Sequence, residues 1–178
     1  MTKVQIILCN DQGIPTGKYL EKELAHTGEG KKHLAITVLI YNSKNQVLLQ
    51  LRKHKRFDKL WDTTGATDLK HLKNKDETFD VAARRCLTEE YEIIEKIPLK
   101  NLGVFNYYAS YGNECENEHC AILVGEYNGE VKLNPSDGYQ CIWMDKNDFL
   151  EDITENSHKY TKWATEAADI LKEKGFFN

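Results

Sequence analysis

The segment Glu77-Thr-Phe-Asp-Val-Ala-Ala-Arg-Arg-Cys-Leu-Thr-Glu-Glu-Tyr-Glu-Ile93 decides the fold of this 178-residue chain. Its apolar residues recur at helical spacing and acidic residues precede them, which predicts an amphipathic helix over residues Asp76 to Ile94. Glu77, Arg85 and Glu89 are separated by eight and four positions, so their side chains can share one helix face. Clustered carboxylates suit Mg²⁺ or Mn²⁺, cations that bind oxygen donors together with diphosphates. A solvated, charged helix without a cation would explain the same pattern.

Strand-like runs stand on both sides of this helix. The turn residues Asn42-Ser43-Lys44-Asn45 between two of them predict a hairpin. A second amphipathic helix is expected over residues Ser157 to Lys174, where apolar residues form one stripe. Together the elements predict one α/β or α+β domain over residues 1–178, with helices packed on a sheet. The runs expected to be strands are Val4–Cys9, Leu34–Tyr41, Gln46–Arg52, Leu102–Ala109, His119–Tyr127 and Tyr139–Trp143.

Composition limits the classes of function. The net charge is -4 and 29% of the residues are charged, a balance that argues against non-specific nucleic-acid binding. Five scattered cysteines without a CxxC pair favour reduced thiols over a disulfide framework or a structural zinc site. Neither a signal peptide nor an apolar run of ~20 residues, the length of a membrane helix, is visible. We expect a cytoplasmic monomer or homodimer with a small-molecule partner and no nucleic-acid or membrane partner.

The helical segment resembles the Nudix box, whose pattern is G-x5-E-x7-R-E-U-x-E-E-x-G-U, where U is aliphatic. The positions that fit in register are Glu77, Arg85, Leu87, Glu89, Glu90 and Ile93. Others depart, because His71 and Glu92 replace the two glycines and Cys86 replaces the glutamate after the arginine. The resemblance implies a Nudix-type mixed β-sheet sandwiched by helices. It also implies an Mg²⁺ or Mn²⁺ site at Glu77, Glu89 and Glu90, with one carboxylate fewer than the pattern provides.

Four stretches carry a second resemblance: Asn10-Asp11-Gln12-Gly13-Ile14-Pro15-Thr16-Gly17, Ala25-His26-Thr27, His33-Leu34-Ala35 and Glu116-Asn117-Glu118. They resemble the type 1 isopentenyl-diphosphate isomerases, and the similarity runs over most of the chain and is strongest before residue 52. The resemblance implies a second site for a transition metal such as Zn²⁺ or Mn²⁺. Two histidines and a glutamate pair match the isomerase ligands, and an aspartate stands at the position of a third histidine. Independently of the family, Glu116 and Glu118 lie two residues apart, so both carboxylates face one side if their segment is extended. The implied ligands are His26, His33, Asp68, Glu116 and Glu118.

The proton-transfer residues of the isomerases are only partly present. Their motif W-T-N-x-x-C-x-H-P matches the stretch from Trp61 to Asp68, so Ala66 stands where the catalytic cysteine belongs. Alanine carries no transferable proton. Cys115 and Cys120, which flank the glutamate pair, are the candidates to replace the missing thiol. Glu118 matches the glutamate that acts with the cysteine.

An aromatic wall and a set of basic residues complete the resemblance. Tyr107 fits the tyrosine ahead of the glutamate pair. His158 is the expected match to a tryptophan whose ring stabilises carbocation charge, and Trp163 is expected in the core. Arginine and lysine bind diphosphate oxygens through charge-assisted hydrogen bonds. The basic residues at or near the isomerases' diphosphate contacts are Lys22, Arg52, Lys55 and Arg85, although a solvated loop would explain Lys55 equally well.

Three functions remain open. We favour a metal-dependent hydrolase of a small diphosphate-containing substrate, with Glu89 and Glu90 holding Mg²⁺, Glu118 acting as base and Tyr107 beside it. The retained carboxylates and the lost cysteine motivate this hypothesis. The first alternative is an isopentenyl-diphosphate isomerase with an altered acid–base pair, motivated by the chain-wide resemblance. The second is a non-catalytic diphosphate binder, motivated by the changed positions Ala66 and Cys86.

Overall fold

The computed structural model describes residues 3–73 and 75–177, and its centre is a mixed β-sheet. Strand β3 (His33–Tyr41) runs parallel to β10 (Glu114–Glu126) and antiparallel to β6 (Gly65–Asp68). Strand β9 (Lys100–Tyr111) pairs with the far side of β10, and β4 (Gln46–Arg52) pairs with β3. The other elements are β1 (Gln5–Cys9), β2 (Pro15–Glu21), α1 (Lys22–Ala25), β5 (Trp61–Asp62), β7 (Lys70–Leu72), β8 (Lys75–Asp76), α2 (Phe79–Tyr91), β11 (Gly138–Asp145), α3 (Lys146–Glu155), the 3₁₀ turn η1 (Ser157–Lys159) and α4 (Lys162–Glu173).

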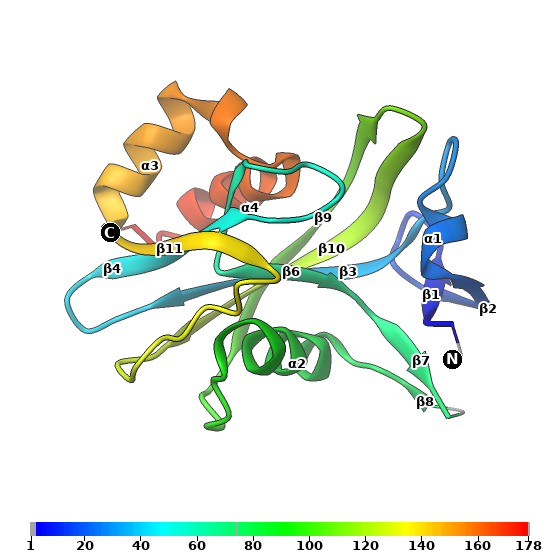
Figure 1. Ribbon diagram of the computed structural model, residues 1–178, viewed down its shortest axis with the longest axis horizontal. Coiled ribbons are helices and arrows are strands. Elements are labelled where there is room, and N and C mark those ends of the chain that lie inside the picture. Colours follow the sequence, from blue (N-terminus) through cyan, green and yellow to red (C-terminus); the bar gives the residue numbers. More distant parts are fainter. Residues whose placement is uncertain (1–2, 74, 178) are drawn as a thin grey trace.

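Helices cover both faces of this sheet, which confirms the expected sandwich (Figure 1). Helix α2 lies on one face, over a core cluster to which β3 contributes Ile36, Val38 and Ile40. Helices α3 and α4 lie on the other face, over a cluster that includes Leu39 and Ile122. Because alternate residues of a strand point to opposite faces, a strand covered on both sides is apolar along most of its length. Strand β3 is accordingly buried from its first residue to its last but one.

Helix α2 carries the segment that predicts the fold. It begins at Phe79, because the Thr78 hydroxyl oxygen accepts a hydrogen bond from the Val81 N–H and caps the first turn. It ends at Tyr91, since the next residue, Glu92, has a left-handed φ of 56°. The helix is therefore shorter at both ends than the sequence pattern predicts.

The helix expected over residues Ser157 to Lys174 is divided. Ser157–Lys159 forms a 3₁₀ turn, and α4 starts only after Thr161, whose hydroxyl oxygen accepts a hydrogen bond from the Ala164 N–H. The interruption places Tyr160 in a backbone bridge with Trp61 of β5. None of the helices among the described residues is long and apolar enough to cross a membrane.

Candidate metal and diphosphate site

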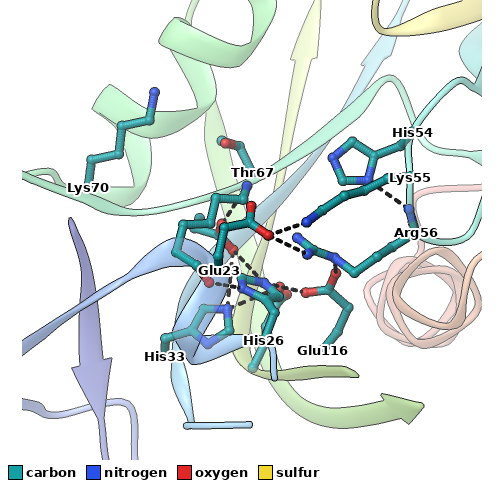
Figure 2. Close-up of polar contacts among 12 residues, drawn as sticks. Glu23, His26, His33, His54, Lys55, Arg56, Thr67, Lys70 and Glu116 are labelled. Carbon is teal, nitrogen blue, oxygen red and sulfur yellow. Dashed lines mark hydrogen bonds and ion pairs between the residues drawn. The ribbon is translucent and has the colours of Figure 1, made fainter. Parts of the chain in front are cut away.

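Two paired strands and a short helix bring the expected transition-metal ligands together. The parallel pairing of β10 with β3 sets Glu118 beside His33, and Glu116 lies two residues earlier on the same face. The antiparallel pairing of β6 with β3 carries Asp68 to the same end of the sheet. His26 directly follows α1. Figure 2 shows His26, His33 and Glu116 converging from these separate elements.

The five residues form a compact, buried group of donors. Their ligand atoms all lie within 4.8 Å of one another. His26 Nε2 is 2.8 Å from Glu116 Oε2 and 3.7 Å from Asp68 Oδ1. His33 Nε2 is 3.2 Å from Asp68 Oδ1 and 3.5 Å from Glu118 Oε1. Within residues 3–73 and 75–177 this is the single such group of three or more His, Cys, Asp or Glu donors.

Backbone contacts fix the orientation of both imidazole rings. The Nδ1 atoms of His26 and His33 lie 2.6 and 2.7 Å from the carbonyl oxygens of Lys22 and Lys31. A carbonyl oxygen only accepts, so each Nδ1 carries a proton and each Nε2 faces the carboxylates. In the neutral tautomer these Nε2 lone pairs face oxygen atoms, an arrangement that a proton or a metal cation stabilises. Histidines that bind metals are commonly held by such a contact at the other nitrogen.

The carboxylates of the cluster also fit a divalent cation. Asp68 Oδ2 is 2.7 Å from Lys22 Nζ, yet no described residue donates a hydrogen bond of good geometry to this buried oxygen. Burial opposes ionisation of Glu116, but the hydrogen bond and positive charge of His26, together with a hydrogen bond from Glu118, keep the pKa of Glu116 below its usual value. Two imidazoles and three carboxylates suit Zn²⁺ or Mn²⁺ better than Mg²⁺. The donor set therefore fits the metal that the resemblance implies.

An aromatic wall adjoins Glu118. Tyr107 Oη donates a hydrogen bond of 2.6 Å to Glu118 Oε2, and burial raises the pKa of the Glu118 carboxyl. The Trp163 ring lies 5.8 Å from the Tyr107 ring and lines the adjacent cavity. The expectation that His158 takes the tryptophan position is wrong, because His158 is exposed on η1. Trp163 is buried as expected, but the helix start after Thr161 also turns its ring toward the site.

A cavity of about 280 Å³ opens beside the cluster, and its lining contains both cationic and acidic side chains. Its basic residues are Lys22, Arg52, Lys53, Arg56, Lys70 and Arg85. Arg52 Nε is buried without a hydrogen-bond partner among the described residues, which leaves a donor for an anion. The expected diphosphate residue Lys55 is not among the lining residues, since its ammonium pairs with Glu23 (Figure 2) and also with Glu114.

The Nudix-box residues reach the same cavity without forming a second cluster of three donors within the described chain. Arg85 Nε is 2.8 Å from Glu77 Oε1, and Arg85 Nη1 is 3.3 Å from Glu89 Oε2. Glu77 Oε2 accepts hydrogen bonds from Arg85 and from the Lys70 N–H. Both oxygens of Glu77 are thus engaged, so Glu77 holds Arg85 in place rather than facing a cation. The expected metal-binding role of Glu77 has no support from this geometry.

Glu90 turns inward beside Glu89. It accepts hydrogen bonds from Gln50 Nε2 at 2.8 Å and from the Cys86 thiol at 3.1 Å. Burial raises the pKa of the Glu90 carboxyl to about 7, although both hydrogen bonds oppose the rise. Cys86, at the position of a box glutamate, therefore supports its neighbour in place of offering a carboxylate. Glu89 and Glu90 both line the cavity, although both oxygens of Glu90 accept hydrogen bonds.

Neither flanking cysteine takes the place of the thiol missing at Ala66. Ala66 lines the cavity. Cys120 packs in a buried cluster with Tyr107 and Trp163 but does not line the cavity, and burial raises the pKa of its thiol well above the usual value. Cys115 points to the turn at Gly30. Among the described residues, the lining of the cavity therefore includes Ala66 and no cysteine.

The sequence pattern does not predict several of the residues that line the cavity. Arg56 is only 1% exposed, and its Nε is 3.2 Å from Glu116 Oε1, so it supports a ligand of the cluster. The basic run from Lys53 signals the loop but does not tell which side chains turn inward, because left-handed φ angles at Phe57 and Lys59 set its path. Lys70 could be found from strand alternation, since it follows Asp68 by two residues.

Comparisons with known proteins agree with this geometry. The NUDIX domain family matches residues 31–164. An isopentenyl-diphosphate Delta-isomerase of Shigella boydii is 31% identical over 168 residues, which cover 92% of this chain and 88% of the relative. A crystallised Deinococcus radiodurans protein shares the fold with a TM-score of 0.71 at 17% identity, over 93% of this chain and 97% of that chain. A MutT NUDIX hydrolase of Burkholderia pseudomallei aligns with a TM-score of 0.61 at 17% identity, over 79% of this chain and 98% of that chain.

Proposed function

This chain belongs to the Nudix superfamily, and from that premise we propose that it is a metal-dependent hydrolase of a small diphosphate-containing molecule. One observation carries the proposal: a single cavity is lined by six cationic side chains and by two groups of carboxylates. The cationic side chains match the charge of a diphosphate. The carboxylates match the divalent cations that accompany diphosphates in proteins.

The two groups of carboxylates have different donors and so suit different cations. His26, His33, Asp68, Glu116 and Glu118 would hold a transition metal such as Zn²⁺ or Mn²⁺. Glu89 and Glu90 would hold Mg²⁺ or Mn²⁺ at the other group. Bound divalent cations supply Lewis acidity and neutralise charge on the diphosphate.

Residues of the chain itself carry the remaining steps. Lys22, Arg52 and Arg85 bind the diphosphate oxygens. Glu118 takes a proton from the attacking water while the water oxygen bonds to phosphorus and the bridging P–O bond breaks. A raised pKa suits Glu118 to accept that proton near neutral pH, and Tyr107 Oη holds the carboxylate in position. The leaving phosphate departs with the electron pair of the broken bond.

Ala66 supports hydrolysis over isomerisation. Moving an allylic double bond requires proton delivery on one face of the substrate and proton removal on another. Glu118 can serve one face, but position 66 offers only a methyl group and the described lining residues include no cysteine. Hydrolysis needs one proton acceptor, which Glu118 provides.

Isomerisation of isopentenyl diphosphate is the second candidate, and the aromatic wall favours it. The Trp163 ring stands 5.8 Å from Tyr107, and Tyr107 contacts the carboxylate of Glu118. An aromatic face of this kind stabilises cationic charge on a hydrocarbon. Hydrolysis of a nucleoside or sugar diphosphate would not require such a wall.

Phosphate release and label incorporation separate the candidates. Purified protein with Mg²⁺ or Mn²⁺ is incubated with nucleoside, sugar and prenyl diphosphates, and we expect phosphate or pyrophosphate release from at least one. E118Q should abolish that release, whereas E151Q, on an exposed face of α3, should not. The absence of release from every compound overturns the hydrolase proposal. Deuterium incorporation from deuterated water into the allylic product would instead establish isomerisation, and thermal stabilisation without turnover would indicate a binder.

A further inference from the structure

His54 lies in the loop between β4 and β5 and lines the cavity among cationic side chains. The backbone N–H of His54 donates a hydrogen bond of 3.2 Å to Asp58 Oδ1, which closes the loop. Its ring Nδ1 accepts a hydrogen bond of 3.2 Å from the Arg56 N–H. Figure 2 shows one ring nitrogen turned to the Arg56 backbone and the other turned away from it. The ring is thus oriented by the backbone of its own loop.

The contact with Arg56 determines which ring nitrogen carries the proton. A backbone N–H only donates, so Nδ1 of His54 has to present its lone pair. The proton of the neutral ring is therefore on Nε2, the nitrogen left free of the loop. Protonating Nδ1 as well would set two donors against each other and break this hydrogen bond.

The surroundings of His54 also oppose a positive charge. His54 is exposed at the edge of the cavity, yet the desolvation of its ring by neighbouring atoms and the nearby cations Arg52, Lys22 and Arg56 lower its pKa to about 4, and Glu116 counteracts them only weakly. These groups come from β4, α1, the loop itself and β10, which are the elements whose charges face the ring. At neutral pH His54 is therefore an uncharged donor beside the cationic side chains Lys22, Arg52 and Arg56.

We propose that His54 binds the diphosphate ligand as a neutral imidazole, donating a hydrogen bond from Nε2–H to a phosphoryl oxygen. This inference rests on the proposed function for the class of ligand, but it does not require hydrolysis. A neutral donor adds a directed contact without adding to the repulsion among Lys22, Arg52 and Arg56. A donor whose proton position is already set needs no rearrangement when the ligand arrives.

Binding of inorganic pyrophosphate in the presence of Mg²⁺, measured by calorimetry on the full chain, tests the proposal. H54F removes the donor, and we expect the Kd to rise roughly 10-fold, as for loss of a hydrogen bond to a charged group. H54Q places an amide N–H near the position of Nε2 and should stay within about 3-fold of wild type. H158F, at an exposed histidine of η1, is the matched control and should not change the Kd. H54F that binds like wild type overturns the proposal.

Two further measurements test the protonation state of His54: ¹⁵N NMR of its ring, and the number of protons that the protein takes up on binding pyrophosphate. With ring-¹⁵N histidine, we expect the Nε2–H tautomer of His54 at pH 7 with and without pyrophosphate. Calorimetry in buffers of different ionisation enthalpy should show equal proton uptake for wild type and H54Q. The proposal that His54 binds as a neutral Nε2–H donor is overturned if the ring is an Nδ1–H tautomer, or if wild type takes up protons on binding and H54Q does not. Wild type that does not bind pyrophosphate overturns the ligand assigned to His54, whereas binding without hydrolysis of any diphosphate overturns only the proposed function.

Discussion

At position 66 a methyl group faces the cavity where a thiol would complete an acid–base pair with Glu118. The metal cluster, Tyr107 and Trp163 are arranged around it, so the second candidate function lacks one group. Under the proposed function, the side chain at position 66 is the group whose identity decides between hydrolysis and isomerisation. Substituting it is the most direct test of whether the rest of the site is competent for isomerisation.

A66C should therefore gain isomerisation. A positioned general acid contributes ~100-fold or more to a rate, so deuterium incorporation into dimethylallyl diphosphate should rise at least about 10-fold over wild type. A66S is the control, because a hydroxyl of similar size is a much weaker acid. If A66C remains folded and incorporates no label with Mn²⁺ and Mg²⁺ present, a second defect blocks isomerisation.

Glu92 shows a different consequence of one residue. It ends α2 with a φ of 56°, and the Nudix pattern has a glycine at this position. A left-handed conformation costs roughly 1 kcal/mol for a residue with a Cβ, and the exposed ion pair with Lys132 compensates little of it. We expect E92G to raise the free energy of unfolding by about 0.5–1 kcal/mol. Denaturant unfolding measures this; E92A, which keeps the Cβ, should show no comparable gain.

At the scale of the elements, Asp62 joins three of them. Its Oδ2 accepts hydrogen bonds from Arg52 of β4 at 2.9 Å and from Trp163 Nε1 of α4 at 2.8 Å. Its Oδ1 accepts a hydrogen bond from the Thr161 hydroxyl at the N-terminus of α4. The Arg52 guanidinium in turn lies 4.8 Å from the centre of the Trp163 ring. One buried carboxylate thus places a cation for the diphosphate and an aromatic ring on the same cavity.

D62A should loosen both side chains. It leaves a buried cation and an indole N–H unpaired, so we expect a loss of about 2–4 kcal/mol in the free energy of unfolding. D62N, which can still accept from Trp163, should lose less stability but bind pyrophosphate more weakly through Arg52. D169A, at an exposed position of α4, is the control. If D62A unfolds like wild type, Asp62 does not connect these elements.

The regular elements are the part of the fold that the sequence predicts. The six expected strands form, and so does the box helix, because their apolar spacing is long and regular. The sequence pattern does not predict the helix α3, which buries only Phe149 and Ile153. It also misses β2, which is largely exposed, and the pieces α1 and β5–β8, whose four or fewer residues carry no periodicity. The same distinction governs the site. Glu116 and Glu118 follow from strand alternation, whereas the inward turn of Arg56 depends on a loop path that no local pattern encodes.

For the molecule as a whole, the metal cluster concentrates three carboxylates and two imidazoles inside the fold. Burial of three carboxylates opposes folding, and without a cation the two imidazoles must bind protons to offset that charge, so Mn²⁺ or Zn²⁺ should stabilise the protein. A cation at 100 times its Kd adds about 2.7 kcal/mol. Thermal unfolding after chelation and after adding each metal measures this gain. H33Q should strongly reduce the stabilisation by added metal, and H158Q should leave it unchanged. If the metal stabilises both variants equally, it binds elsewhere in the protein.

The pH dependence of stability should reveal Glu90 in the chelated protein. Its folded pKa of about 7 lies above the ordinary glutamate value of 4.5, so the folded state holds a proton that the unfolded chain releases. The contribution of Glu90 is therefore complete below pH 4.5 and is lost as pH rises through 7. Relative to E90Q, which does not titrate there, wild type should lose about 1–2 kcal/mol across this window, a value reduced for solvent at the cavity mouth. E151Q on α3 is the control, and its free energy of unfolding should depend on pH as in wild type. If the free energies of unfolding of wild type and E90Q change with pH in parallel, Glu90 ionises without cost in the folded protein.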